Sequence, residues 1–229
     1  MRSLFDTLWS VICENNDDAV TRVTDFLEAG TNVNMCPLYI NTSCSALHMA
    51  ANDDRIEILR LLINAGAIID HKWLDSGYPH PRGCTALMMA CLTKSVRCVE
   101  LLCFSGADVN TTSTNGTTTA LHCALRYNFD VNSMKSTLKI IKTLVQNGFE
   151  TSDLNYNLLL ANIDEDFRME MEAILKRRTS PETPKDLLHL ARSKIRKLLM
   201  NKRSDTNLFI TARTLQLPKL LQDIIIYNV

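Results

Sequence analysis

The sequence lacks three features that would each define a functional class. Its 25 Lys and Arg residues balance 25 Asp and Glu residues, so it has no excess positive charge of the kind that drives general nucleic-acid binding. It has no apolar run near the ~20 residues that a membrane-spanning helix needs. It has no Cys-x-x-Cys pair, which makes a structural zinc site improbable. We therefore expect no nucleic-acid partner, no membrane partner and no metal, and none of these absences argues against a protein partner.

The sequence also lacks the patterns from which enzymes are usually recognised. It contains neither a glycine-rich phosphate loop nor a nucleophile elbow. His71, His80 and His189 are scattered and show no metal-ligand spacing. We therefore predict no catalytic residues and no cofactor, and we expect a protein that is not an enzyme. A catalytic cysteine is the alternative that the sequence leaves open.

Eight cysteines occur at irregular spacings. Several fall on apolar helical stripes, among them Cys91, Cys98, Cys103 and Cys123. In a chain of this length, such cysteines indicate buried free thiols in a reducing compartment rather than a disulfide framework. Asp6 and the polar run 14–18 leave too short an apolar core for a signal peptide. We expect a soluble intracellular protein in the cytoplasm, with the nucleus as a second compartment.

Internal repetition is the most informative feature of the first two-thirds of the chain. Three segments share the pattern Ser/Thr-Ala-Leu-x-x-Ala, and they begin at Ser45, Thr85 and Thr119. Each is followed by an apolar segment of helical period that ends at a glycine, namely Gly66, Gly106 or Gly148. An earlier copy of this second segment ends at Gly30. The opening Ser or Thr can cap a first helix, and the glycine suits the left-handed end of a second helix.

This pattern resembles the ankyrin repeat, whose period is about 33 residues. The resemblance implies an all-α solenoid of helix-turn-helix repeats with hairpin-like fingers between them. We expect the small residues Ala50, Ala90 and Ala124 to allow close packing of the first helices. Apolar positions of the second helices should bury the other face: Ile56, Leu59, Ile63, Val99 and Leu102. His48 and His122 stand in the motif, where we expect them to bond loop backbone rather than to act as ligands or bases.

Two insertions interrupt the regular spacing. The finger at 69–83 is longer than the family pattern by about seven residues. About eight further residues lie between Leu121 and Gly148, and we place them at 126–139, between the two helices of the third clear repeat. Insertions in a solenoid map to loops on one face, where binding often takes place.

The repeats and the C-terminal segment form two predicted domains. Residues 3–30 read as a first repeat without its opening motif, and 155–177 as a degenerate last one, as terminal repeats often are. The Pro-containing run that follows breaks the helical pattern. We therefore predict an ankyrin-repeat domain over 1–178, with about four repeats plus the degenerate one, and a second unit over 179–229.

The second unit carries two motifs. An apolar helical stripe comes first, at Leu187, Leu190, Ala191, Ile195 and Leu198. The sequence Leu215-Gln216-Leu217-Pro218 then precedes an apolar helix. A piece of this size buries itself poorly, so its exposed stripe should seek a partner's groove.

These two motifs, in this order, resemble the SOCS box. Leu187, Ala191 and Ile195 match the family's elongin-binding pattern of a Leu, a small residue and an aliphatic residue at intervals of four, and Leu190 lies on the same stripe. The predicted cullin-binding residues match the Leu-Pro-x-Pro motif, with Gln216 in place of its first Pro; they are Leu215, Leu217 and Pro218. Ala191 stands where the family often has Cys, and Asp186 where a small or hydroxylated residue is usual.

The whole chain thus resembles the ankyrin repeat and SOCS box family. The resemblance implies partners: elongin C with elongin B, a cullin (usually cullin-5) and its RING protein. It implies a substrate-recognition adaptor that binds target proteins through its repeats and promotes their ubiquitination and proteasomal degradation. The alternative is a non-catalytic ankyrin scaffold or inhibitor whose C-terminal helices only cap the stack.

The long finger supplies the candidate target-binding residues. They are His71, Trp73, Tyr78 and Arg82, and the last three belong to the residue types enriched at binding hot spots. The alternative is that Trp73 and Tyr78 fold back over the neighbouring finger. A locally basic run lies at 176–178, with further Lys and Arg in the C-terminal helix. We interpret it as a solvated helix face, with a nuclear-localisation or nucleic-acid patch as the alternative.

Overall fold

The computed structural model describes residues 4–14, 18–36, 43–75, 80–126, 130–149 and 164–176. Within these ranges the protein is all-helical, as predicted, and contains no strand. The helices are α1 Leu4–Cys13, α2 Ala19–Glu28, α3 Ala46–Asn52, α4 Ile56–Asn64, α5 Ala86–Leu92, α6 Val96–Phe104, α7 Ala120–Leu125, α8 Val131–Gln146 and α9 Glu165–Lys176. None of these helices is both long and apolar enough to cross a membrane. The predicted unit over 179–229 lies outside the described residues.

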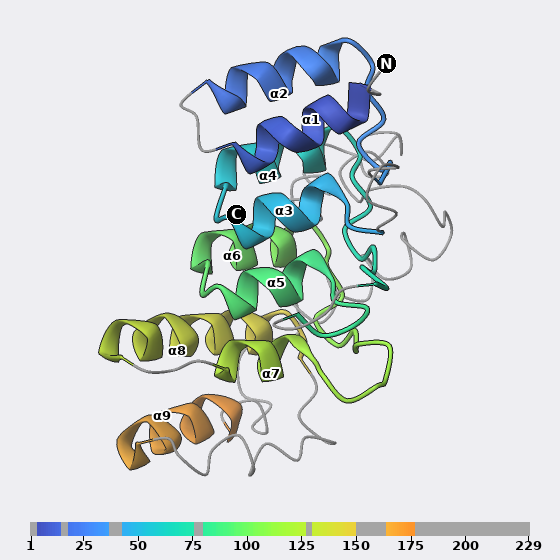
Figure 1. Cartoon of the computed structure of the whole chain (residues 1–229). Coiled ribbons are helices and arrows are strands. Elements are labelled where there is room, and N and C mark those ends of the chain that lie inside the picture. Colours follow the sequence, from blue (N-terminus) through green and yellow to red (C-terminus); the bar gives the residue numbers. More distant parts are fainter. Residues whose placement is uncertain are drawn as a thin grey trace, which may run out of the picture.

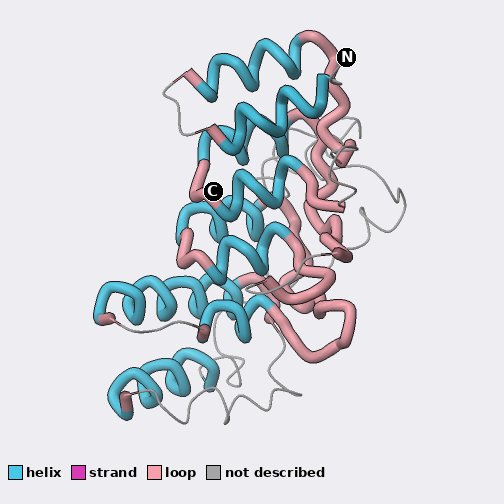
Figure 2. Tube along the Cα trace, viewed as in Figure 1, coloured by secondary structure: helices cyan, strands magenta, loops and turns pink. Residues whose placement is uncertain are grey.

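The helices stack as successive pairs along one axis (Figure 1). The first helices of the pairs, α1, α3, α5 and α7, form one row, which we call the inner row, and each contacts the next. The second helices, α2, α4, α6 and α8, form the outer row in the same way. The connections between pairs project from one side of this two-layered stack (Figure 2). The arrangement is a solenoid in which each repeat buries its apolar faces against its neighbours.

Local sequence signals explain where the helices begin and end. The Thr85 hydroxyl accepts a hydrogen bond from the Met88 amide, so it caps α5. Ser45 and Thr119 form reciprocal capping boxes with the histidines three residues later. Gly66 and Gly106 follow α4 and α6 with φ of 96° and 100°, in the left-handed region that favours glycine. The predicted roles of the Ser/Thr and Gly positions are thus confirmed.

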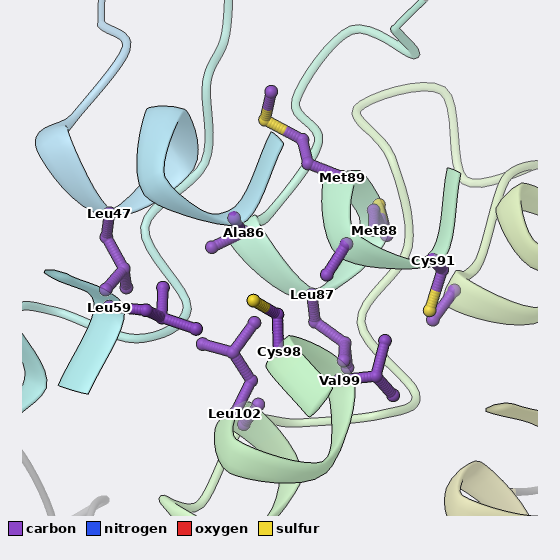
Figure 3. Close-up of a cluster of buried hydrophobic side chains, with 14 of the residues drawn as sticks. Leu47, Leu59, Ala86, Leu87, Met88, Met89, Cys91, Cys98, Val99 and Leu102 are labelled. Carbon is purple, nitrogen blue, oxygen red and sulfur yellow. The ribbon is translucent and has the colours of Figure 1, made fainter. Parts of the chain in front are cut away.

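A continuous apolar core runs between the two helix rows (Figure 3). Ala50, Ala90 and Ala124 are fully buried, which confirms that small residues allow close packing of the inner row. Leu59, Ile63, Val99 and Leu102 are also buried, whereas Ile56 packs only partly against the core. All eight cysteines are free thiols, as expected, and six of them are buried: Cys44, Cys84, Cys91, Cys98, Cys103 and Cys123.

The insertion predicted as a loop at 126–139 is helical from Val131 onward. Helix α8 has 16 residues, whereas α4 and α6 have nine each. The Asp130 carboxylate accepts a hydrogen bond from the Ser133 amide at 2.7 Å, which caps the longer helix one residue before it begins. Met134 and Leu138 pack against the core, so they continue its apolar stripe toward the N-terminus. The extra residues therefore lengthen a helix instead of forming a loop.

Both ends of the array are helical, as expected. Helices α1 and α2 contact each other and form the first repeat, although its opening motif is missing. At the other end α9 packs against α8, and it buries Phe167, Met171 and Leu175. The first half of the predicted last repeat, 155–161, lies outside the described residues.

Candidate functional site

The long finger connects α4 to α5 and is described over residues 69–75 and 80–84. Its two arms meet at an isolated antiparallel bridge between Trp73 and Cys84. The Trp73 amide donates to the Cys84 carbonyl at 2.9 Å, and the Gly83 amide donates to the Trp73 carbonyl at 2.8 Å. The finger therefore has the hairpin-like form that the repeat pattern predicts.

The first arm of this finger is bonded to Ser43, which lies just before α3. The Ser43 amide donates to the Asp75 carboxylate at 2.8 Å, and the Leu74 amide donates to the Ser43 hydroxyl at 2.7 Å. A ring nitrogen of His71, Nε2, lies 2.9 Å from the Ser43 carbonyl oxygen. These contacts fix residues 71–75 against the preceding repeat.

The next finger fixes the opposite side. The Lys72 ammonium donates to the Thr112 carbonyl at 2.8 Å, and the Thr114 amide donates to the Arg82 carbonyl at 2.9 Å. Gly83 has φ of 72°, and a Cβ at this position would lie 2.1 Å from the Thr114 hydroxyl oxygen. Glycine is therefore required here both by backbone conformation and by the close approach of the neighbouring finger.

A side-chain ladder joins successive fingers at equivalent positions, four residues after each helix-ending glycine. Asn34 donates to the Gly66 carbonyl at 3.0 Å and accepts from the Ile68 amide at 2.8 Å. Asp70 accepts from the Asp108 amide at 3.0 Å, and Asn110 donates to the Gly148 carbonyl at 3.1 Å. We call Asn34, Asp70 and Asn110 the finger ladder. It couples the fingers into one surface.

His48 links the inner helix row to the long finger. Its Nδ1 accepts from the Ser45 amide at 3.2 Å, so Nε2 carries the proton and donates to the Cys84 carbonyl at 3.2 Å. Burial, together with the nearby His71, lowers the pKa of His48 to about 4. His48 is therefore a neutral structural residue, as predicted. His122 bonds Thr119 in the same way on α7.

The predicted target-binding residues differ in their surroundings. Trp73 is half-buried, with its ring centroid 6.3 Å from His48 and 5.6 Å from His80, and it packs against the core. His71 is also half-buried. Arg82 is exposed, and its Nε donates to the Leu74 carbonyl at 3.4 Å. Tyr78 lies outside the described residues.

The finger also exposes residues that sequence reasoning did not single out. The Leu74 side chain is 54% exposed, and Asp75 beside it is exposed too. A large apolar residue next to an acidic one in an inserted finger is the signal that could have identified Leu74. Together with Arg82, these side chains are the parts of the described finger most available to a partner, whereas Trp73 and His71 mainly support them.

Two of the buried thiols, Cys98 and Cys123, are poorly suited to nucleophilic catalysis. Burial raises the pKa of each of them to about 12. A thiolate is the reactive form, and these pKa values keep the thiols protonated at neutral pH. No group of three or more His, Cys, Asp or Glu side chains in the described ranges could hold a metal ion.

The predicted elongin-binding and cullin-binding residues all lie outside the described ranges. The former are Leu187, Leu190, Ala191 and Ile195, and the latter are Leu215, Leu217 and Pro218. These assignments stay predictions, as does the target-binding role of the finger.

Comparison with known proteins identifies the repeats. A family model described as ankyrin repeats (3 copies) matches residues 8–113 and 73–157. The nuclear factor NF-kappa-B p105 subunit of Gallus gallus is 37% identical over 106 residues, which are 45% of this chain and 10% of that protein. The same subunit of Mus musculus is 35% identical over 86 residues, 36% of this chain and 8% of that protein. A putative ankyrin repeat protein of fowlpox virus (strain NVSL) is 32% identical over 100 residues, 44% of this chain and 27% of that protein.

The chain therefore spans about a quarter or less of the length of these relatives. The family match covers more than half of the chain, and the helix pairs, their capping and the fingers agree with it. Ankyrin repeats serve protein–protein interaction, because their stacked helices and fingers present an extended surface and need no chemistry of their own. The chain belongs to the ankyrin-repeat family.

Proposed function

We propose that the chain is a substrate-recognition adaptor of an elongin B/C–cullin–RING ubiquitin ligase. The ankyrin repeats would capture a target protein, and residues 179–229 would dock onto elongin C and a cullin, of which cullin-5 is our expectation. The observation that carries the proposal is the order of the two C-terminal motifs, at 187–195 and 215–218, directly after an ankyrin array. Each motif alone is a weak signal.

In this proposal the chain itself performs no catalysis. The ubiquitin-transfer chemistry belongs to other subunits, and the chain contributes proximity and orientation. The raised pKa values of the described thiols agree with this division of labour. Solvent-exposed Leu74 and Arg82 would contact the target, because the hydrogen bonds to Ser43 and Thr114 hold the backbone on which they stand.

Co-purification with elongin B/C tests the assignment. Replacement of Leu187 and Ile195 by Ser in the full chain should abolish elongin binding and leave the helical content of the repeats unchanged. A matched control replaces Leu74 and Ile174, two apolar residues of the repeat array, by Ser. If the Leu187/Ile195 variant captures elongin C as well as the unchanged chain does, the SOCS-box assignment is wrong.

A second variant separates the two docking steps. Replacement of Leu217 and Pro218 by Ala should weaken cullin binding and spare elongin binding, because these residues belong to the second motif only. Loss of both partners together would mean that the segment is structural and that the proposed division into two motifs is incorrect.

A plain ankyrin scaffold or inhibitor is the second candidate. The similarity to the NF-kappa-B p105 subunit favours it, because that protein is named as a subunit of a nuclear factor and not as a component of a ligase. The C-terminal helices would then only cap the stack. Under this alternative the Leu187/Ile195 variant should lose thermal stability, whereas the unchanged chain should show no elongin binding.

A further inference from the structure

Helix α8 presents a row of lysines to solvent. Lys135, Lys139 and Lys142 are all exposed and follow one another at intervals of four and three residues. At 3.6 residues per turn they lie within an arc of about 60° and span about 10 Å along the helix axis. Val131, one turn before Lys135, is 66% exposed and lies on the same face. We call these four residues the α8 lysine stripe.

Direct ion pairs do not neutralise this stripe within the described residues, although α9, which packs against α8, carries acidic side chains. Helix α8 contains no acidic residue, and none of the three lysines takes part in an ion pair with the described part of the chain. The neighbouring outer helices differ. Glu57 of α4 lies 3.9 Å from Arg60 on the same helix and 4.0 Å from Arg97 on α6.

The stripe does not favour folding of the helix. Like charges three or four residues apart destabilise a helix by a few tenths of a kcal/mol. Part of the stripe also stands on the residues by which α8 exceeds α4 and α6. The N-terminal end of α8 reaches past the ends of α6 and α7, with α9 lying beside it (Figure 1). The buried face of this extension packs against the core through Met134, whereas the stripe lies on its exposed face.

We propose that the α8 lysine stripe binds an acidic helical segment of a partner protein. Carboxylates at intervals of four and three residues on such a helix would match the three ammonium groups, and an apolar residue one turn away would cover Val131. A protein segment fits better than a polyanion because three charges over about 10 Å fall short of the 6–10 phosphate contacts and the 4–8 basic residues typical of DNA and anionic-membrane binding. The surface lies on the outer helix row, apart from the long finger.

The test measures fluorescence anisotropy of the full chain with two labelled helical peptides at about 0.15 M salt, where charges more than ~8 Å apart are largely screened. One peptide carries Glu at intervals of four and three residues with a Leu one turn away, and the other has the same composition scrambled. The first should bind more tightly. Changing Lys135, Lys139 and Lys142 to Gln should weaken its binding about tenfold, consistent with the loss of three exposed ion pairs.

The matched control changes Arg22, Arg60 and Arg97 to Gln, which alters net charge equally but elsewhere on the stack. It should leave peptide affinity within about twofold, because these arginines stand on α2, α4 and α6 and are not part of the stripe. The lysine variant should melt at the same temperature as the unchanged chain or slightly higher.

Several results would overturn the proposal. If both peptides bind with equal affinity, or if both triple variants lose the same affinity for the patterned peptide, the attraction is a diffuse charge effect and the stripe is not a binding site. Tighter binding of duplex DNA or of phosphatidylserine vesicles than of the patterned peptide would assign the stripe to another class of ligand. A lower melting temperature of the lysine variant would show that the lysines stabilise the fold.

Discussion

Protonation of His48 should destabilise the repeat stack as the pH falls. The folded protein holds the pKa of His48 at about 4, because the ring is buried and His71 lies nearby. In the unfolded chain the ring is no longer buried, and an unperturbed histidine has a pKa of about 6.5. Between these two values the unfolded state binds the proton and the folded state does not. Stability is therefore complete above pH 6.5 and decreases as the pH falls toward 4.

The size of the effect follows from the two pKa values. A full shift from 6.5 to about 4 corresponds to roughly 3 kcal/mol of unfolding free energy, at 1.36 kcal/mol per pH unit. About 2 kcal/mol of this should already be lost between pH 7.5 and pH 5, before most carboxylates protonate. The stability should therefore be measured between pH 7.5 and pH 5, because the protonation of acidic side chains adds a further pH dependence below pH 5.

Urea unfolding followed by circular dichroism at both pH values measures this loss. The variant His48→Gln should be less stable than the unchanged chain at pH 7.5, because it loses the Nδ1 acceptor, but its stability should depend less on pH by about 2 kcal/mol. His122→Gln is the matched control, since His122 forms the same capping box but is only half-buried. If the stability of His48→Gln keeps the full pH dependence of the unchanged chain, another group causes that dependence. The proposal that His48 binds a proton on unfolding would then be incorrect.

Three further predictions concern the core and the long finger. Leu102→Ala should lower the unfolding free energy by about 2–5 kcal/mol in the same urea assay, because Leu102 is completely buried between the helix rows; a loss below 1 kcal/mol would contradict close packing there. Gly83→Ala should cost about 1–3 kcal/mol, from the positive φ and the approach of Thr114, and an added Thr114→Ala change should recover only the steric part of the lost melting temperature. Trp73→Ala should lower the melting temperature, because the indole packs near the rings of His48 and His80. The double change Leu74→Ala with Arg82→Ala should leave the melting temperature within a few degrees and reduce target capture. A drop in melting temperature of similar size in both variants would argue against the division into supporting and contacting residues.

The sequence was sufficient to predict the repeats because their signals are local. Local backbone geometry explains why a Ser or Thr caps the helix, why a small Ala follows and why a Gly ends the second helix, and none of these signals depends on distant residues. Gly66 and Gly106 illustrate this, since each follows its helix in the left-handed conformation. The buried cysteines and the backbone contacts of His48 could likewise be predicted, because apolar period and motif position determine them.

The extension of α8 and the attachment of the finger could not be predicted in the same way. A surplus of residues between two helices does not reveal whether it forms a loop or further helical turns, and here the Asp130 cap and the core contacts of Met134 favour the helix. The bonds from Ser43 to Asp75 and Leu74 join residues about 30 positions apart. Such pairings depend on how successive fingers stack, which the spacing of motifs does not determine.

The finger ladder has a consequence for the kinetics of recognition. Asn34, Asp70 and Asn110 hold each finger against the next, so loop conformational entropy is lost when the chain folds and not when a partner arrives. A partner that docks on the described parts of the fingers then meets backbone that is already fixed, and less of the contact energy is spent on ordering it. Differences in affinity among targets should therefore arise mainly from dissociation rates, set by the side chains displayed on the fingers, while association rates vary little from one target to another.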